Sequence, residues 1–461
     1  MSNNNLTQKY ITLYQNHKER LLDNSSQIVN EYRDKAFDAF KKSGIPTVKS
    51  EAYKYTNIEE PFSRDYQSVL ESEKFSGNIE ELFKCNVEEL DTYTMFTVNG
   101  KFIGDNNPGA LPEGVIVGGF AEMAEMHPAI VEKYYGKSAL IEKDGVIALN
   151  TMLATDGLFI YVPSGIKPEK PLQVVNILTA ENDILVNRRD LIVVEGGADL
   201  RLLFCDHTIS TNRFLVNAVT EGFVADSGTL DFYNLQNQHN GTVQIGGYYF
   251  QQDKKSLLNA NYFSLNSGIA RNNVFVDMNG LHGENHISGL TLVDKNQHVD
   301  NFLSISHNVP ECESNELFKS VLDDAGSGAF TGRIYVAPDA QKTNAYQSNN
   351  NLLLTDTALM NARPQLEIYA DDVKCSHGAT VGQLDEEALF YLRARGIGKD
   401  EATILLMYAF AYEVIEKIRV PALKEQIRTL VEKRFRGELD KCDSCIVCAD
   451  INKVMNDLSG V

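Results

Sequence analysis

Residues 273–293 read NVFVDMNGLHGENHISGLTLV, and this stretch contains the pattern that decides the fold. The runs 273–278 and 290–293 are short and rich in Val, Phe, Leu and Thr, which favour strands. The dipeptides Asn279-Gly280 and Ser288-Gly289 beside them are typical of turns. The stretch therefore predicts short strands separated by tight turns.

The same pattern extends from about residue 150 to residue 375, and no strong helical periodicity interrupts it. Asn is frequent beside the apolar residues, and further turn dipeptides separate the runs. A solenoid fits this pattern, because each rung buries its inner face against its neighbours. A β-sandwich is the alternative, and the repeat is too irregular for the rungs to be counted. Other predicted strands are 157–162, 172–178, 191–194, 200–204 and 333–336, and other predicted turns are Gly196-Gly197, Ser227-Gly228, Asn240-Gly241 and Ser267-Gly268.

The residues before the strand region favour helices. Apolar residues from Leu21 to Phe40 recur at helical spacing, and Gly44 and Pro46 end that pattern. A further helix is expected near 79–83. A hairpin is expected around Asn99-Gly100, between 94–98 and 101–104, followed by a helix at 122–135 that Pro128 interrupts.

The chain after Leu384 is again helical in pattern. Asp385-Glu386-Glu387 begins a helix that has Arg393 and Arg395 in its last turn and Gly396 as its C-terminal cap. Asp400-Glu401 and Pro421 begin two more helices. We therefore expect an N-terminal helical domain (1–95), a mixed α/β bridge (96–150), a solenoid core (151–380) and a C-terminal helical domain with a cysteine-rich tail (381–461).

Composition restricts the function. The 461 residues carry a formal net charge of −20, which argues against partners with phosphate backbones or anionic membrane surfaces. The polar first residues have no signal-peptide pattern, and no run is long enough to span a bilayer. We therefore expect a cytoplasmic protein whose seven cysteines are reduced rather than paired in disulfides.

Cys375 and His377 form the most informative pair, at the transition from strands to helices. Residues two apart on a strand face the same side, so a thiolate and an imidazole would be presented together. Such a pair suits a soft metal or an iron–sulfur cluster, although two ligands do not complete a site. A buried cysteine beside a structural histidine is the commoner explanation of such a pair.

Three other motifs carry weaker signals. Cys442, Cys445 and Cys448 have the spacing of cluster-binding loops and of half a zinc site, and a reduced tail without a metal is equally compatible. The segment 282–286 contains two histidines but lacks the H-E-x-x-H order of zinc proteases. Gly136-Lys137-Ser138 resembles the end of a phosphate-binding loop that lacks its upstream glycine, so no ATP hydrolysis is expected.

Long segments resemble the SufB/SufD family of iron–sulfur cluster assembly proteins. They are PQLEIYADDVKCSHGATVG at 364–382, ALFYLRARGI at 388–397 and the residues from Ala340 to Leu354. Ser-His-Gly after Cys375 is similar to the SufD branch, whereas SufB typically has a glutamate after this cysteine. EAYKYT at 51–56 is similar to a SufD pattern that usually has tryptophan where Tyr53 stands.

The resemblance implies a mainly β protein: a parallel β-helix core flanked by an N-terminal helical region and a C-terminal helical domain. It implies a non-enzymatic scaffold subunit that pairs with a SufB-like subunit through the β-helix. His377 would lie at that interface with Cys375, where a transient iron–sulfur cluster is shared with the partner. No cofactor would be bound stably, although such complexes have been linked to reduced flavin. A homodimer is expected when SufB is absent.

The C-terminal helices would dock a SufC-like ATPase, or would only cap the end of the solenoid. The residues expected in the dock are Leu389, Tyr391, Arg393, Arg395, Gly396 and Ile397.

Three alternatives remain open. A SufB-like main scaffold would need more core cysteines than Cys205 and Cys312. A β-helix carbohydrate-active enzyme would need paired carboxylates at a groove. A standalone metal or redox protein would use the cysteine-rich tail.

Overall fold

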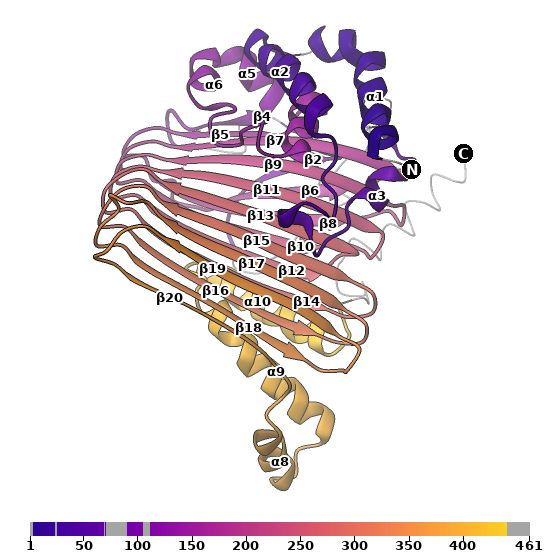
Figure 1. Ribbon diagram of the computed structural model, residues 1–461, viewed down its shortest axis with the longest axis vertical. Coiled ribbons are helices and arrows are strands. Elements are labelled where there is room, and N and C mark those ends of the chain that lie inside the picture. Colours follow the sequence, from indigo (N-terminus) through magenta and orange to yellow (C-terminus); the bar gives the residue numbers. More distant parts are fainter. Residues whose placement is uncertain (1–2, 24, 69, 71–89, 105–110, 440–461) are drawn as a thin grey trace.

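The chain winds into a parallel β-solenoid of about eight turns in the computed structural model (Figure 1). The structure describes residues 3–23, 25–68, 70, 90–104 and 111–439. Each turn contributes one strand to each of two ten-stranded sheets. The predicted mainly β fold with a solenoid core is therefore confirmed, and a β-sandwich is not formed.

The first sheet has the strand order β19-β17-β15-β13-β11-β9-β7-β5-β4, with β1 paired to β7. All its ladders are parallel except β4 with β5. Its strands are β1 (Gln67–Ser68), β4 (Ile116–Gly119), β5 (Leu158–Val162), β7 (Ile184–Val194), β9 (Phe214–Val224), β11 (Thr242–Gln252), β13 (Ile269–Met278), β15 (His298–His307), β17 (Ser327–Val336) and β19 (Leu359–Ile368).

The second sheet has the order β20-β18-β16-β14-β12-β10-β8-β6-β2-β3. It is parallel apart from the antiparallel pair of β2 with β3, which is the predicted hairpin at Asn99-Gly100. Its strands are β2 (Tyr93–Val98), β3 (Lys101–Ile103), β6 (Leu172–Leu178), β8 (Asp199–Thr208), β10 (Thr229–Asn237), β12 (Leu257–Asn266), β14 (Glu284–Val293), β16 (Glu313–Leu322), β18 (Asn344–Leu353) and β20 (Lys374–Gly382).

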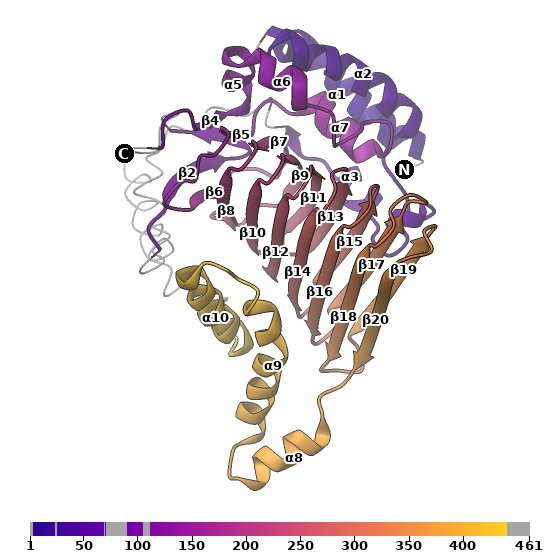
Figure 2. The same ribbon diagram turned by 90° about the vertical axis from the view of Figure 1, so that its left-hand side faces the viewer.

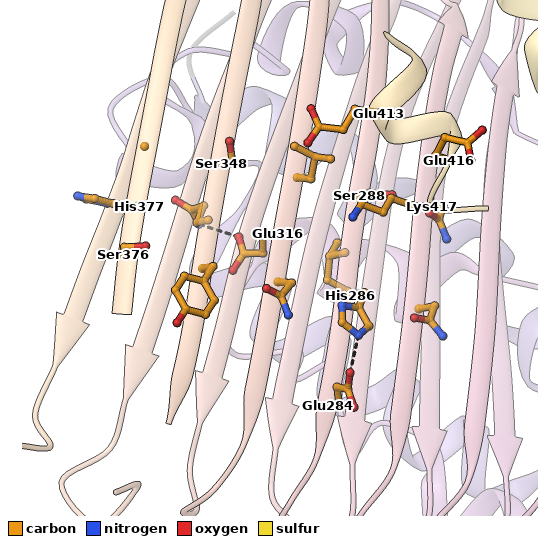
Figure 3. Close-up of a pocket in the computed structure, with 18 of the residues that line it drawn as sticks. Glu284, His286, Ser288, Glu316, Ser348, Ser376, His377, Glu413, Glu416 and Lys417 are labelled. Carbon is orange, nitrogen blue, oxygen red and sulfur yellow. Dashed lines mark hydrogen bonds and ion pairs between the residues drawn. The ribbon is translucent and has the colours of Figure 1, made fainter. Parts of the chain in front are cut away.

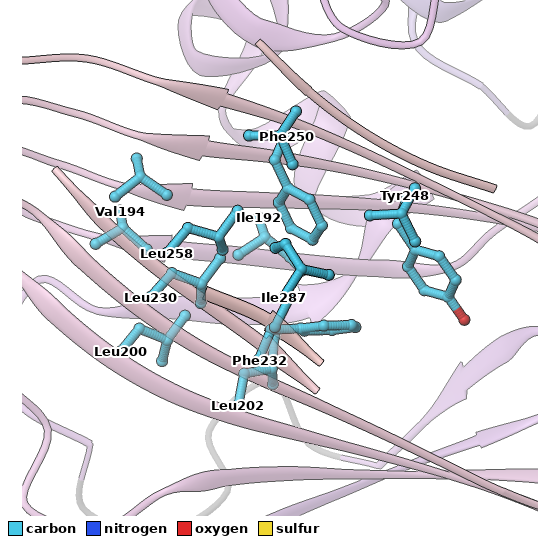
Figure 4. Close-up of a cluster of buried hydrophobic side chains, with 14 of the residues drawn as sticks. Ile192, Val194, Leu200, Leu202, Leu230, Phe232, Tyr248, Phe250, Leu258 and Ile287 are labelled. Atoms are coloured by element: carbon cyan, nitrogen blue, oxygen red, sulfur yellow. The ribbon is translucent and has the colours of Figure 1, made fainter. Parts of the chain in front are cut away.

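Apolar side chains from both sheets fill the solenoid interior. On β8, Leu200, Leu202 and Phe204 point inward to this core, while Leu203 and Cys205 on the opposite face join a separate outer cluster. Figure 4 shows part of the interior, where residues of both sheets such as Ile192 and Leu230 meet. Successive side chains of a strand point to opposite faces of the sheet, so β8 contributes both to the interior core and to the outer cluster.

Polar side chains occupy another part of the interior and hydrogen-bond from rung to rung. Asn176 Nδ2 donates to Asp206 Oδ1 over 2.7 Å, and Asn234 Nδ2 donates to the other oxygen of Asp206 over 3.0 Å. Asn272 Nδ2 donates to Asn301 Oδ1 over 2.9 Å. Buried amides are tolerated here because neighbouring rungs supply their partners. These ladders account for the frequent Asn in the sequence.

One predicted turn is wrong. Ser288-Gly289 lies inside β14 rather than between strands. A Cβ atom at Gly289 would lie 2.3 Å from the ring of Phe318 on the next strand of the sheet. The glycine therefore makes room for a core aromatic side chain. By contrast, Gly197 and Ser227 do lie in turns, with φ angles of +70° and +58°.

The N-terminal helices cover the outer face of the first sheet (Figures 1 and 2). The periodic stretch from Leu21 to Phe40 is divided into two helices, because the side chain of Ser26 caps the second by accepting from the Val29 N–H. Pro128 begins its own helix, as the sequence suggested. The helix expected at 79–83 lies outside the described residues. The helices are α1 (Asn3–Asp23), α2 (Gln27–Ser43), the 3₁₀ turn η1 (Glu51–Tyr53), α3 (Glu59–Ser63), α5 (Phe120–Met126), α6 (Pro128–Tyr134) and α7 (Gly145–Leu153).

The C-terminal helices α8 (Glu386–Ala394), α9 (Lys399–Ile415) and α10 (Pro421–Phe435) begin where the sequence predicted. Helices α9 and α10 pack on the outer face of the second sheet, whereas α8 extends away from the solenoid (Figure 2). The alternative that these helices cap the end of the solenoid is therefore wrong. Their apolar faces match the outward-facing Leu, Tyr and Phe of the sheet, not its end.

The two ends of the solenoid differ. Antiparallel strands β4 and β3 terminate the sheets at the first end. At the other end β19 and β20 are the outermost strands, and each is paired on one side only among the described residues. Unpaired backbone groups of an edge strand favour pairing with another chain. The last rung is therefore an open surface.

Candidate functional site at the open end of the solenoid

Cys375 and His377 lie on β20, the outermost strand of the second sheet. Cys375 is in register with Ala345 on β18, and His377 is in register with Gln347. Ala345 and Gln347 are buried residues that face the interior. Residues in register in a parallel sheet share a face, so Cys375 and His377 lie on the interior face of the last rung. No further rung of the described chain covers that face.

The two side chains differ in exposure. His377 is exposed, whereas Cys375 is half-buried and packs against the small apolar cluster around Ile334 and Ala345. Burial raises the pKa of the Cys375 thiol, and a hydrogen bond with the Ala345 backbone opposes this shift weakly. Cys375 is therefore a protonated thiol near neutral pH and must lose its proton to bind a metal.

The strands beneath this rung carry a buried polar pair. Gln347 on β18 donates from Nε2 to Oε2 of Glu316 on β16 over 2.6 Å. Only 3% of each residue is exposed. Glu316, Gln347 and His377 occupy one register row across β16, β18 and β20. Sequence reasoning missed this pair, because 31 residues separate the two side chains.

A groove of about 830 Å³ separates α9 from strands β12 to β20 and reaches Ser376 and His377 (Figure 3). His286 Nε2 lies 2.6 Å from Glu284 Oε1 on one side of the groove. Across it, the end of α9 and the following turn contribute Glu413, Glu416, Lys417 and Arg419. His286 is thus a strand residue with a carboxylate neighbour, outside any helical zinc motif.

Few candidate metal ligands lie together in the described residues. In the described ranges, no group of three or more His, Cys, Asp or Glu side chains is arranged to hold a metal ion. Cys205 and Cys312 are buried. Cys442, Cys445 and Cys448 lie outside the described residues. Among the described residues, Cys375 and His377 are thus two candidate ligands, fewer than the three that a metal-binding group would need.

The loop that resembles a phosphate-binding loop holds a carboxylate of the protein itself. The backbone N–H groups of Gly136, Ser138 and Ala139 donate to the Glu221 carboxylate over 2.9–3.0 Å. Arg189 pairs with the same carboxylate over 2.5 Å. These donors are fully used inside the fold, so the loop offers nothing to a nucleotide.

The segment 51–56 fastens the N-terminal region to the solenoid. The Tyr53 hydroxyl donates to Asp144 Oδ2 over 2.6 Å, and the Arg271 guanidinium stacks 4.1 Å from the Tyr53 ring centroid. Thr56 Oγ1 lies 2.9 Å from His298 Nε2 and hydrogen-bonds Asp300. The role of this motif is therefore packing, and His298 is a structural residue.

Helix α8 carries the residues expected to dock an ATPase. None of its residues is buried, and Phe390 and Tyr391 are 74% and 58% exposed. Asp385 caps the helix by accepting from the N–H groups of Glu387 and Ala388, and Gly396 ends it with a φ angle of +90°. Arg395 stacks on Tyr391 and donates to its hydroxyl. Leu389, Arg393 and Ile397 lie on the same projecting segment.

Comparison with known families decides the assignment. The model of the SUF system FeS cluster assembly SufBD core domain matches residues 176–410, and that of the SufBD protein N-terminal region matches residues 4–174. The chain belongs to the SufBD family. The first match covers strands β7 to β20, α8 and most of α9, and the second covers the N-terminal helices and the first strands of the solenoid.

Relatives within the SufBD family agree with the assignment. The chain is 30% identical to the iron-sulfur cluster assembly protein SufD of Escherichia coli K12, over 86% of this chain and 90% of that protein. It is 28% identical to SufD of Bacillus subtilis 168, over 70% and 75%. It is 27% identical to a SufBD family protein of Synechocystis PCC 6803, over 89% and 91%. The chain is a SufD-like iron–sulfur cluster assembly protein.

Within the parts of the chain that the structure describes, no helix has the length and apolar character needed to cross a membrane.

Proposed function

We propose that this chain is the SufD-type scaffold subunit of a complex with a SufB-like subunit and a SufC-like ATPase. The observation that carries the proposal is the last rung of the solenoid, where Cys375 and His377 lie on an interior face that the described chain leaves uncovered. A SufB-like chain would pair with β19 and β20 and complete the ligand set. An iron–sulfur cluster, or its iron and sulfide, would be the cargo of this seam.

The surface around the seam supports a protein partner. Leu359, Ile368 and Tyr369 on or beside β19 and Val381 on β20 are 36–61% exposed. Large apolar side chains on an unpaired sheet edge favour burial against a second protein. Without a SufB-like partner, a second copy of this chain would use the same edge, because sister subunits present similar surfaces.

A split ligand set suits assembly rather than storage. The described part of the chain supplies one thiol and one imidazole at the seam, so these two groups alone would not hold the cluster firmly. A small movement of the interface would change the number of ligands and release the cargo. We therefore assign the chain no catalytic step of its own. The cytoplasmic location and the link to reduced flavin remain predictions.

The C-terminal helices divide two tasks between them. Helices α9 and α10 are anchored to the solenoid, since Lys319 pairs with Glu413 over 2.6 Å and Arg434 pairs with Asp294 over 2.7 Å. The projecting α8 is left to bind the ATPase. Deletion of everything after Gln383 would also expose the apolar outer face of the second sheet, so it is a poor test of docking.

Substitution of the seam histidine tests the function. We expect His377→Ala to leave the complex with the SufB-like subunit and the ATPase intact, because the side chain contributes little to the apolar edge. Maturation of iron–sulfur enzymes in cells that depend on this complex should fall strongly. His286→Ala, in the groove but away from the last rung, is the matched control and should mature them normally. Full activity of the His377→Ala complex would remove the ligand role.

A further inference from the structure

Glu316 and Gln347 lie on β16 and β18, the two strands that precede β20 in the second sheet, in the same register row as His377. Glu316 is two strands from the free edge, and Gln347 is the register neighbour of His377. The Gln347 amide points to Glu316, with 2.6 Å between Nε2 and Oε2, and Figure 3 shows His377 directed away from Glu316. The Gln347 amide therefore points toward Glu316 and away from His377.

The second oxygen of each side chain has no hydrogen-bond partner in the described structure. Glu316 Oε1 and Gln347 Oε1 are both buried. A protonated carboxyl group has one O–H donor, which would serve the Gln347 oxygen while the Gln347 N–H serves the other Glu316 oxygen. Burial raises the pKa of Glu316 to about 8, in agreement with a neutral acid. An acid–amide pair with two hydrogen bonds accounts for both orphaned oxygens.

The position of the Gln347 amide is also defined from the opposite sheet. Gly332 on β17 faces it, and a Cβ atom at Gly332 would lie 2.3 Å from Gln347 Nε2. The bare glycine leaves just enough space for the inward-turned amide. The hydrogen bond to Glu316 therefore holds the Gln347 amide in place, and the lack of a side chain at Gly332 leaves the space that the amide occupies.

We propose that Glu316 is a positioning residue that keeps the Gln347 amide away from His377, so that the imidazole remains free for the iron of the cargo. The reason is competition for hydrogen bonds. Neighbouring strands lie about 4.8 Å apart, so a glutamine released from Glu316 can reach the imidazole of the next strand. That the imidazole binds iron rests on the proposed function. That Glu316 prevents a hydrogen bond between Gln347 and His377 does not depend on it.

Chemical modification of His377 by diethyl pyrocarbonate tests the positioning role. The reagent acylates an imidazole nitrogen with a free lone pair, and peptide mass spectrometry gives the rate at His377. The full chain is used at a dilution where it is monomeric. We expect Glu316→Leu to slow the modification about twofold to tenfold, the range set by one hydrogen bond of ordinary strength. Glu316→Gln, which can still pair with an amide, should react at the unmodified rate.

Two further variants distinguish positioning from a structural role. Glu316→Leu combined with Gln347→Leu should restore the unmodified rate, because no amide remains to bind the imidazole. An unchanged rate in Glu316→Leu, or a double variant as slow as Glu316→Leu, would overturn the proposal. Gln347→Leu alone keeps the test valid if Glu316→Leu does not fold: the rate should not change, and a faster rate would show that the amide already binds His377. These rates do not depend on cluster maturation, so the proposed function can fail separately.

Discussion

At the scale of single residues, Glu316 is a buried acid that stays neutral. Burial raises its pKa from 4.5 to about 8, and its one hydrogen-bond partner is the uncharged Gln347 amide. A pKa raised on folding means that the folded chain holds a proton that the unfolded chain has lost. The stability from this group is complete below about pH 4.5 and is lost as the pH rises toward 8.

We therefore predict that Glu316→Gln changes the pH dependence of stability. Relative to the variant, the unmodified protein should lose about 1 kcal/mol of unfolding free energy per pH unit between pH 5 and 8. Thermal unfolding midpoints of both proteins at pH 5, 6.5 and 8 measure this difference. His377→Gln, on the exposed last strand, is the control and should follow the unmodified protein. Parallel curves for Glu316→Gln would mean that Glu316 is charged in the fold.

Gly289 is a second residue whose role is set by a single contact. Its missing side chain accommodates the ring of Phe318, which a Cβ atom would approach to 2.3 Å. We predict that Gly289→Ala lowers the unfolding free energy by about 1–3 kcal/mol, as overpacking of a core does. Gly382→Ala on β20 is the matched control, because no atom lies within 4 Å of its Cβ position. Equal thermal midpoints for the two variants would contradict the packing account.

At the scale of elements, the apolar halves of the strands were predictable and the polar halves were not. The sequence indicates 191–194 as a strand, yet β7 begins at Ile184 and includes Asn187, Arg188 and Asp190. Such residues read as loop because their partners lie one rung away, about 30 positions along the chain. Asn187, for example, accepts a hydrogen bond from Asn217, and Asp190 accepts one from Thr220, in each case from a residue 30 positions further along the chain.

The candidate site shows the same limit. Cys375 and His377 were found because their two-residue spacing places them on one face of a strand. The interior position of that face, and the pair Glu316–Gln347 behind it, depend on the stacking of rungs. An irregular repeat did not allow this stacking to be counted from the sequence.

Helix α8 has no buried residue, and it exposes the aromatic side chains of Phe390 and Tyr391. We predict that Phe390→Asp combined with Tyr391→Asp weakens binding of the SufC-like ATPase by at least tenfold, since buried aromatic anchors dominate interfaces. Binding of the purified proteins by calorimetry measures the effect. Met126→Asp on α5 is the control, because it is 61% exposed at the opposite end of the molecule. Unchanged affinity in the α8 variant would place the dock elsewhere.

At the scale of the whole molecule, the asymmetry of the solenoid determines where a partner can bind. Helices cover much of both outer faces, and antiparallel strands terminate the first end. In the part of the chain that the structure describes, the last rung combines unpaired strands with exposed apolar residues and the pair Cys375 and His377. The net charge of −20 repels unrelated acidic proteins, but it does not prevent a partner with a complementary surface from binding at this edge.

Amide hydrogen exchange of β19 and β20 tests this account most directly. The chain alone, at a concentration where it is monomeric, is compared with its complex with the SufB-like subunit. We predict that the complex slows exchange strongly within 359–382, while the central strands β12 and β14 exchange equally slowly in both states. Unchanged exchange within 359–382, with protection elsewhere on the chain, would contradict the claim that the open end of the solenoid is the seam.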